Sequence, residues 1–378
     1  MRFLIQSAEL RRLLATAAAC VEKGSSNPIN RCILLQAYED GVRATATDKG
    51  MTFIGNFSAN VEIPGEVAID AANALQVAKV LPNDVVSVQL GDNYRIDVKC
   101  GKSAYKLAGQ TASEFQPTPS FEVSGSLQIQ AADLRRIIDQ TWFSIAPDDN
   151  RYGLNGAHLD AVDTPAGRML RMVGTDGNRL SWAQAPFTGT LAIGRRMLLP
   201  RKPLAEVRKM IDGLSGPVEI GFGERAAVMR FEGTTVHMRL LEAEFPNYKE
   251  VLPTNFKRRV VVDRSRFLES LRRVSIFATD GSHSVRFAFS QDGIVMTARK
   301  LDAGDAREEV DVKSFDGEPI TMGFNATFLQ EAITAAGEDD VLLRLGDGLS
   351  PAIVTPLDST DTTADTDALF VVMPVRLD

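Results

Sequence analysis

The fold is decided by the stretch Leu127-Gln128-Ile129-Gln130-Ala131-Ala132-Asp133-Leu134-Arg135-Arg136-Ile137-Ile138. Its first four residues alternate apolar and polar side chains, which is the period of a strand. Leu134, Ile137 and Ile138 then follow at i, i+3 and i+4, which places them on one face of a helix. The stretch therefore predicts a short strand that runs directly into a helix.

The same strand–helix pattern occurs three times along the chain. One copy spans residues 3–14, beginning 124 residues before the central copy, and a looser copy begins at residue 260, 133 residues after it. Repeats at a domain-sized interval indicate a triplicated chain. We expect three domains, at residues 1–122, 123–253 and 254–378.

Each third of the chain also predicts a second helix and several hairpins. In the first third, residues 67–69 read as a strand and Asp70 as the N-cap of a following helix. Residues 86–90 and 94–99 alternate apolar and polar side chains around a Gly-Asp-Asn turn, which indicates a hairpin. Frequent hairpins without βαβ alternation predict the α+β class, with two helices packed on antiparallel sheets in each domain.

The composition is that of an ordinary globular protein. The chain has 378 residues, of which 44% are hydrophobic and 24% are charged. Cys20, Cys32 and Cys100 form no CxxC motif, so we expect buried free thiols in a reducing compartment. No signal peptide and no membrane-spanning apolar run are recognised, which predicts a soluble, cytoplasmic protein without a membrane partner.

The distribution of charge is more informative than its sum. We expect six helices, at residues 7–23, 71–80, 131–141, 201–212, 264–274 and 326–336. The chain has a net charge of −7, yet these helices together carry +6, which leaves −13 for the strands and loops. If the helices share one surface, that surface is basic and suits a polyanion bound through its phosphates, independently of base sequence. Charge alone favours the simpler interpretation that these are solvated helix faces.

Motifs of catalysis are lacking. The three histidines are widely spaced, and the sequence contains no HExxH, GxGxxG, Walker or GxSxG motif. The carboxylate pairs Asp148-Asp149 and Asp339-Asp340 could hold Mg²⁺ for phosphoryl chemistry, but adjacent acids are more often simply solvated. The sequence therefore favours a binding or scaffold protein without a cofactor or metal over an enzyme.

Six short motifs carry a more specific signal because they occur together in one order. They are Arg151-Tyr152-Gly153-Leu154-Asn155-Gly156, Thr175-Asp176-Gly177-Asn178-Arg179-Leu180, Leu199-Pro200-Arg201-Lys202, Glu244-Phe245-Pro246-Asn247-Tyr248, Gly323-Phe324-Asn325 and Val371-Val372-Met373-Pro374-Val375-Arg376-Leu377. In order and spacing the chain closely resembles the bacterial replicative sliding clamp, the β subunit of DNA polymerase III. The resemblance covers the whole chain and is weaker in the first third.

The resemblance implies a non-catalytic processivity factor. Two chains of three DNA-clamp domains would form a head-to-tail homodimeric ring around double-stranded DNA, with helices lining the hole. The ring would tether the replicative polymerase during DNA replication. Its implied partners are the DNA polymerase III alpha subunit, the clamp loader, other polymerases, and mismatch-repair or ligase proteins, bound through short clamp-binding peptides.

The resemblance also assigns candidate site residues. The peptide pocket, between the second and third domains of the family, would be formed by Leu154, Thr175, Gly177, Asn178, Arg179, Leu180, Pro246, Val251, Val371, Val372, Met373, Pro374, Val375, Arg376 and Leu377. The DNA-binding candidates are Lys23, Tyr152, Arg201, Lys202 and Lys209. The dimer interface would place Tyr105 and Leu107 of one chain against Ile276 and Phe277 of the other.

Five departures from the family pattern bear on function, one of which is Asp148, at a position where the family often has an amide. Gly24 and Ala72 stand where the family usually has arginine, which argues against the family's DNA contacts in the first domain. Glu250 replaces a frequent arginine at the pocket rim, and Asp378 extends the usual terminus. The weaker resemblance of the first domain and Glu250 leave open a clamp paralogue with a specialised role. The aspartate pairs leave open a nuclease or other DNA enzyme.

Overall fold

The computed structural model describes residues 1–116, 121–147, 153–190, 197–253, 255–279, 283–300, 302–337, 339–357 and 366–377. They form two compact units. The first unit contains residues 1–132, 188–192 and 202–240, and the second contains residues 133–187, 193–201 and 241–378. The middle third of the chain thus contributes strands to both units.

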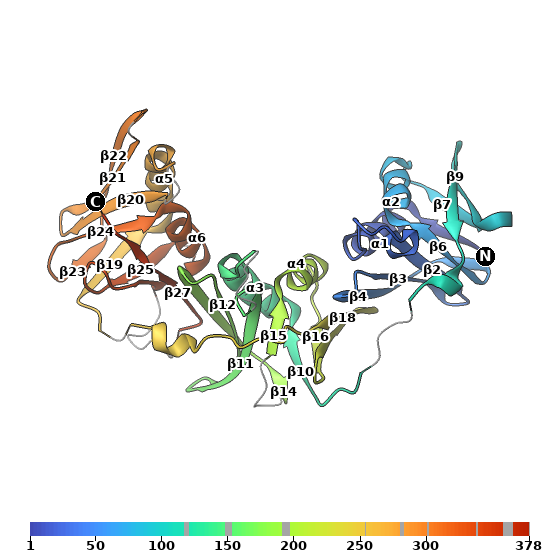
Figure 1. Cartoon of the computed structure of the whole chain (residues 1–378), viewed down its shortest axis with the longest axis horizontal. Coiled ribbons are helices and arrows are strands. Elements are labelled where there is room, and N and C mark those ends of the chain that lie inside the picture. Colours follow the sequence, from blue (N-terminus) through green and yellow to red (C-terminus); the bar gives the residue numbers. More distant parts are fainter. Residues whose placement is uncertain are drawn as a thin grey trace. The chain divides into compact units, whose positions relative to one another are not determined.

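Six α-helices occur in the described ranges, and each directly follows a strand (Figure 1). They are α1 (Ser7–Ala19), α2 (Ala71–Val80), α3 (Ala131–Thr141), α4 (Arg201–Met210), α5 (Arg264–Val274) and α6 (Ala326–Ala336). The predicted N-cap is confirmed, since Asp70 Oδ1 accepts a hydrogen bond of 2.9 Å from the Asn73 backbone N–H. Asp263 and Asn325 cap α5 and α6 in the same way.

The first unit contains one antiparallel sheet. Its strands, in spatial order, are β14 (Thr188–Gly189), β10 (Gly125–Gln130), β16 (Pro217–Phe222), β17 (Ala226–Phe231), β18 (Thr234–Arg239), β4 (Met51–Phe57), β3 (Gly41–Thr47), β2 (Cys32–Tyr38), β6 (Gly65–Asp70), β9 (Ser103–Gln110), β8 (Arg95–Cys100), β7 (Val85–Leu90), β1 (Arg2–Gln6) and β5 (Asn60–Ile63). Strands β18 and β4 pair from Thr234 opposite Gly55 to Met238 opposite Met51. This pairing continues the sheet of the first third into the middle third.

The second unit contains two antiparallel sheets. The larger has the order β15 (Met197–Pro200), β11 (Gly156–Thr164), β12 (Gly167–Thr175), β13 (Arg179–Pro186), β27 (Ala368–Val372), β26 (Ala352–Pro356), β25 (Asp340–Leu345), β19 (Arg258–Asp263) and β23 (Ser314–Asp316). The smaller has the order β22 (Gly304–Val310), β21 (Gly293–Lys300), β20 (Ser284–Ser290), β24 (Ile320–Asn325) and β28 (Pro374–Val375). The predicted α+β class with antiparallel sheets is confirmed.

The three copies of the strand–helix pattern adopt the same local structure. In each, a strand (β1, β10 or β19) runs without a break into a helix (α1, α3 or α5). The predicted hairpin is formed by β7 and β8, although Tyr94 belongs to the turn, where it and Asn93 have positive φ angles of 57° and 53°. The expected helices at 7–23 and 201–212 are shorter, ending at Ala19 and Met210.

The apolar faces of the helices pack into the hydrophobic core of each unit. In the first unit α1 buries Leu10, Leu13 and Leu14, and α1 and α2 lie side by side (blue in Figure 1). In the second unit Phe267 of α5 stacks on Phe287 of β20 with ring centroids 6.2 Å apart. The three cysteines are free and buried, as predicted, and burial raises the pKa of the Cys32 thiol to about 11.

Candidate functional sites

A small apolar pocket of about 230 Å³ lies in the second unit. It is lined by Leu154, Thr175, Gly177, Arg179, Leu180, Pro246, Tyr248, Val251, Val371 and Met373. The pairing of β13 with β27 places Leu180 directly opposite Val371, so two motifs distant in sequence form one wall. Leu180 and Val371 are buried, whereas Val251 and Met373 are 51% and 40% exposed at the mouth.

Nine of the predicted pocket residues line this hollow, and the tenth lining residue, Tyr248, was not predicted to do so. Tyr248 stands in one of the motifs quoted above, two residues after Pro246, and its position in the short helix η5 (Tyr248–Val251) turns it inward. The sequence therefore did contain a signal for this position, namely an aromatic residue two positions after the predicted pocket residue Pro246.

The other six predicted pocket residues are not among those that line the hollow. Asn178 accepts a 3.0 Å hydrogen bond from the Met373 backbone N–H through its carbonyl oxygen, and Val372 is buried. Pro374 and Val375 form β28, which pairs with β24 of the smaller sheet. Arg376 and Leu377 are exposed, and Asp378 lies outside the described residues. The terminal segment thus leaves the larger sheet at Val372 and joins the smaller one at Pro374, with Met373 between them.

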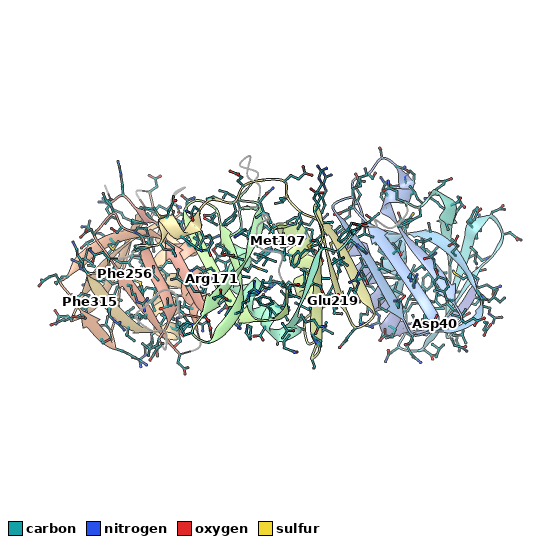
Figure 2. The ribbon with its side chains drawn as sticks, turned by 90° about the horizontal axis from the view of Figure 1, so that it is seen from below. Asp40, Arg171, Met197, Glu219, Phe256 and Phe315 are labelled. Atoms are coloured by element: carbon teal, nitrogen blue, oxygen red, sulfur yellow. The ribbon has the colours of Figure 1, made fainter. Side chains whose placement is uncertain are left out.

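The pocket floor belongs to a buried apolar cluster. Leu180, Tyr248 and Val371 pack with Val173, Trp182, Ile353 and Leu369. Beneath it, the guanidinium of Arg171 (labelled in Figure 2) lies 3.9 Å from the Trp182 ring centre and donates two hydrogen bonds to Gln184 Oε1, of 3.1 and 2.7 Å. A buried charge that is hydrogen-bonded and stacked in this way fixes the shape of the floor.

An aromatic stack supports the wall that carries Pro246. The ring of His158 stacks on Phe245 at 5.2 Å with an interplanar angle of 12°, and lies 6.3 Å from the Tyr248 ring. The Tyr248 hydroxyl donates a 3.3 Å hydrogen bond to Asp160 Oδ2. Burial lowers the pKa of His158 and raises the pKa of Tyr248, so both side chains are held neutral at neutral pH.

The turn from Thr175 to Arg179 is fixed by its own hydrogen bonds. Thr175 Oγ1 accepts from the Gly177 N–H at 3.1 Å and donates to the Arg179 carbonyl at 2.6 Å. Asp176 Oδ1 accepts from the backbone N–H groups of Asn178 and Arg179. Gly177 has φ 87°, a conformation that favours glycine. The pocket wall is therefore preformed.

The charge of Arg179 is fully engaged within the protein. Its Nε donates to Asp176 at 2.9 Å, its Nη1 pairs with Glu331 of α6, and its Nη2 donates to the Phe143 carbonyl at 2.6 Å. The guanidinium also lies 4.3 Å from the Phe328 ring centre and 5.4 Å from that of Phe143. We conclude that Arg179 shapes the pocket rather than presenting a free charge to a ligand.

Two of the predicted DNA-binding cations form ion pairs. Lys202 pairs with Asp48, and Lys209 pairs with Glu206 at 2.9 Å. Arg201 lies over the Trp142 ring, 4.0 Å from its centre. Lys23 is exposed, and Tyr152 lies outside the described residues.

Two of the predicted interface residues lie on the edge strand β9, and the other two lie in a short helix. Tyr105 and Leu107 are half-buried on β9, and Ile276 and Phe277 lie in η6 (Ser275–Phe277), where Ile276 is 67% exposed. Within the described part of the chain, β9 has no partner along its outer edge from Ser103 to Ala108, and β22 has none along its outer edge.

The described residues offer no grouping of three or more histidine, cysteine or acidic side chains that could hold a metal ion. Asp340 pairs with Lys313 at 2.6 Å, whereas Asp148 and Asp149 lie outside the described residues. None of the helices in the described ranges has the length and apolar character needed to cross a membrane.

Comparison with known proteins identifies the family. The models of the N-terminal, central and C-terminal domains of the DNA polymerase III beta subunit match residues 1–119, 128–247 and 249–376. The beta sliding clamp of Vibrio cholerae is 31% identical over 381 residues, and that of Caulobacter vibrioides is 30% identical over 380, with full coverage of each chain.

Solved structures agree with this match. A Pseudomonas aeruginosa sliding clamp bound to griselimycin matches with a TM-score of 0.91 at 29% identity, and a C. crescentus beta sliding clamp with PEG bound to a putative beta-motif tethering region matches at 0.89 and 29%. Both comparisons cover all of each chain. The chain therefore belongs to the bacterial beta sliding clamp family, the beta subunits of DNA polymerase III, which are processivity factors rather than catalytic enzymes.

Proposed function

We propose that two copies of this chain close head to tail into a ring around duplex DNA in the cytoplasm, and that the ring tethers the replicative polymerase through the apolar pocket. The observation that carries the proposal is the pocket itself, in which residues from widely separated motifs form one preformed apolar hollow. We also propose domain boundaries at 122/123 and 253/254, which limited proteolysis would test.

Two unpaired sheet edges support the ring. The outer edges of β9 and β22 belong to the first and the last third of the sequence, so pairing one edge with the other edge of a second copy is a heterologous contact. Such a contact, made twice, closes two chains into a ring without free ends. Tyr105 and Leu107 of one chain would then pack against Ile276 and Phe277 of the next, covering the exposed Ile276 side chain.

Closure of a ring makes strong DNA contacts unnecessary. A ring holds DNA topologically, so contacts of lysine and arginine with phosphates can be weak, salt-dependent and independent of sequence. The positive charge of α4 and α5 suits this role, since each carries four basic residues and one acidic residue. The ion pairs of Lys202 and Lys209 are compatible with sliding because both lysines remain more than 60% exposed.

The pocket favours short peptides with apolar side chains. Its walls are apolar, its one arginine is neutralised by Asp176 and Glu331, and Met373 at the mouth can adapt to different side chains. The proposed ligands are peptide segments of the DNA polymerase III alpha subunit, the clamp loader, other polymerases, and mismatch-repair or ligase proteins.

Topological retention tests the ring. The protein is loaded on nicked circular duplex, washed in high salt, and the DNA is then linearised. Retention on the circle and release after cutting are expected from a closed ring. Loss from both forms in high salt would indicate ordinary electrostatic binding and would overturn the proposal.

Substitution at the pocket mouth tests the peptide site. Met373→Ala should weaken binding of a peptide from the polymerase alpha subunit about tenfold, because it removes a partly exposed apolar wall with little effect on the core. Leu349→Ala is the matched control, since Leu349 is 72% exposed and is not among the pocket residues. Equal affinity of the two variants would exclude this pocket as the peptide site.

A further inference from the structure

The face of the larger sheet that carries the pocket has its side chains in rows across neighbouring strands. Residues opposite each other in antiparallel strands point to the same face, as do alternate residues of one strand. The first row lines the pocket and consists of Thr175, Leu180 and Val371. The second row belongs to the buried apolar cluster and consists of Val173, Trp182 and Leu369.

The third row consists of polar side chains, two of which are buried. Arg171 of β12 lies opposite Gln184 of β13 on one side and opposite Asp160 of β11 on the other. The exposed fraction is 8% for Arg171 and 2% for Gln184. The Arg171 guanidinium donates two hydrogen bonds to Gln184 Oε1 and lies over the Trp182 ring of the second row. A buried charge is costly unless such contacts compensate it, so they hold this row in one arrangement.

Gln184 connects Arg171 to the strand that forms one wall of the pocket. Its Nε2 donates to the Thr366 carbonyl at 3.1 Å, and its backbone N–H donates to the Asp367 carbonyl at 2.9 Å. Thr366 and Asp367 directly precede β27. The Gln184 carbonyl also accepts a 3.1 Å hydrogen bond from Arg136 of α3. Both ends of the Gln184 side chain are thus engaged, one by Arg171 and the other by the segment that leads into β27.

Tyr248 connects the opposite wall to the same row. Its ring lines the pocket, and its hydroxyl donates a 3.3 Å hydrogen bond to Asp160 Oδ2. Arg171 acts on the same hydroxyl through its charge and a side-chain hydrogen bond. Because η5, which carries Tyr248, is not a strand of the sheet, these polar contacts orient the ring relative to β13 and β27.

We propose that Arg171 is a positioning residue for peptide recognition. Arg171 is not among the residues that line the pocket, so it acts through Gln184 and Tyr248, which hold the two walls at a fixed separation. The proposal rests on the proposed binding of peptides in this pocket. Walls that are already in place spare the free energy of ordering them when a peptide binds. Arginine suits the role because its planar guanidinium has several N–H donors in fixed directions and can stack on a ring at the same time.

The first test compares two buried arginines of the same sheet in the full chain. Arg171→Met keeps a long apolar side chain and removes the hydrogen bonds. Arg344→Met is the matched control, since Arg344 is 2% exposed, lies on β25 and is not among the pocket-lining residues. Isothermal titration calorimetry with a peptide of the polymerase alpha subunit should show about tenfold weaker binding for Arg171→Met than for Arg344→Met, the factor expected for one lost hydrogen bond to a charged group. Equal affinity of the two variants would overturn the proposal.

A double-mutant cycle tests the link through the hydroxyl of Tyr248. Tyr248→Phe retains the ring in the pocket wall and removes the hydrogen bonds to Asp160 and Arg171. Combined with Arg171→Met, it should lose less affinity than the sum of the two single losses, because both changes break the same connection. Strictly additive losses would show that Arg171 does not act through Tyr248.

Milder variants of Gln184 keep the role testable if Arg171→Met folds poorly. Gln184→Glu retains an oxygen acceptor for Arg171 and removes only the N–H donor to the Thr366 carbonyl, whereas Gln184→Met removes both links. Gln184→Glu should therefore bind the peptide more tightly than Gln184→Met. The reverse order would contradict a role that depends on the hold of Gln184 on Arg171.

Tryptophan emission separates positioning from a merely structural role. The chain has two tryptophans, so Trp142→Phe leaves Trp182, 3.9 Å from the Arg171 guanidinium, as the only reporter. If Arg171 holds the walls in place, peptide binding should change this emission more when Arg171→Met is added, because the walls then become ordered on binding. An equal change with and without Arg171→Met would assign Arg171 to stability alone.

Failure of the proposed function gives a different result. If the unmodified protein does not bind the peptide, the peptide site itself is refuted, and the role of Arg171 with it. If the unmodified protein binds the peptide and Arg171→Met binds it as tightly as Arg344→Met does, the peptide site stands and only the positioning role is refuted.

Discussion

The guanidinium of Arg179 forms an ion pair with the carboxylate of Glu331, which lies 152 residues later in the chain. The pair joins the start of β13, at the pocket wall, to α6. Because Arg179 also binds Asp176 and the Phe143 carbonyl, it fixes the turn that carries Thr175 and Gly177. Glu331 is not among the pocket-lining residues, yet the shape of the pocket depends on it.

Replacement of Glu331 should therefore weaken peptide binding from outside the pocket. Glu331→Gln keeps the side-chain volume and removes the charge, so the Arg179 guanidinium loses one of its charged partners. We expect a loss of peptide affinity of about threefold to tenfold, because Glu331 is 38% exposed and part of the interaction is screened by solvent. Isothermal titration calorimetry with a clamp-binding peptide measures it.

The control for this prediction is Glu39→Gln, an exposed residue of the first unit. A merely structural role for Glu331 would lower the melting temperature without changing peptide affinity in the folded protein. That result would contradict a positioning role.

Glu250 should determine part of the peptide preference. Its carboxylate is exposed beside Val251 at the pocket and accepts a 2.7 Å hydrogen bond from Asn247. Glu250→Arg reverses the charge at this rim, so peptides with an acidic residue next to their apolar anchor should gain affinity by a few-fold, and basic peptides should lose it. A fluorescence polarisation panel of charge-varied peptides measures the shift, and an unchanged ranking would count against a role for Glu250.

A substitution at Ile276 tests the proposed dimer without unfolding the single chain. It is 67% exposed, so Ile276→Asp should cost little stability in the isolated chain. In the proposed contact the same carboxylate would be buried against Tyr105 and Leu107 without a partner, which is strongly unfavourable. Sedimentation velocity should show a monomer. Leu349→Asp, at another exposed apolar residue, should remain a dimer, and dimeric Ile276→Asp would place the interface elsewhere.

Because His158 is buried, we expect it to make the stability of the folded protein more sensitive to acid. Burial lowers the pKa of His158 in the folded state, an effect that Lys249 reinforces and Asp160 opposes. As pH falls, the unfolded chain therefore takes up a proton on this residue before the folded chain does. Neutral His158 therefore makes a contribution to the free energy of unfolding that is fully present above the ordinary histidine pKa of about 6.5. Below that pH the contribution falls by up to about 1.4 kcal/mol per pH unit, until the pH reaches the lowered pKa of the folded state.

Removal of the imidazole should reduce this dependence. His158→Phe retains an aromatic ring against Phe245 but cannot take up a proton. Its melting temperature should fall less than that of the unmodified protein between about pH 7.5 and 5.5. His283→Asn is the control, since His283 has a positive φ of 47° that asparagine tolerates. An equal fall in both variants would assign the acid sensitivity to other groups.

The local elements follow from short stretches of the amino-acid sequence. The alternation of residues 127–130, the helical spacing of Leu134, Ile137 and Ile138, and the cap at Asp70 each depend on neighbours within a few residues. Their physical causes, side-chain period and capping of free N–H groups, act locally and can therefore be read from one stretch of chain. The family motifs further indicated most of the pocket lining, although Tyr248 was missed.

The contacts between distant parts of the sequence could be recognised only in the folded protein. The pairing of β18 with β4, the ion pair of Lys202 with Asp48, and the approach of Glu331 to Arg179 join residues far apart in the chain. The contact between α1 and α2 likewise joins segments that are far apart in the sequence. Such contacts depend on strand register and helix packing, which the whole core fixes together, so no local pattern in the sequence specifies them.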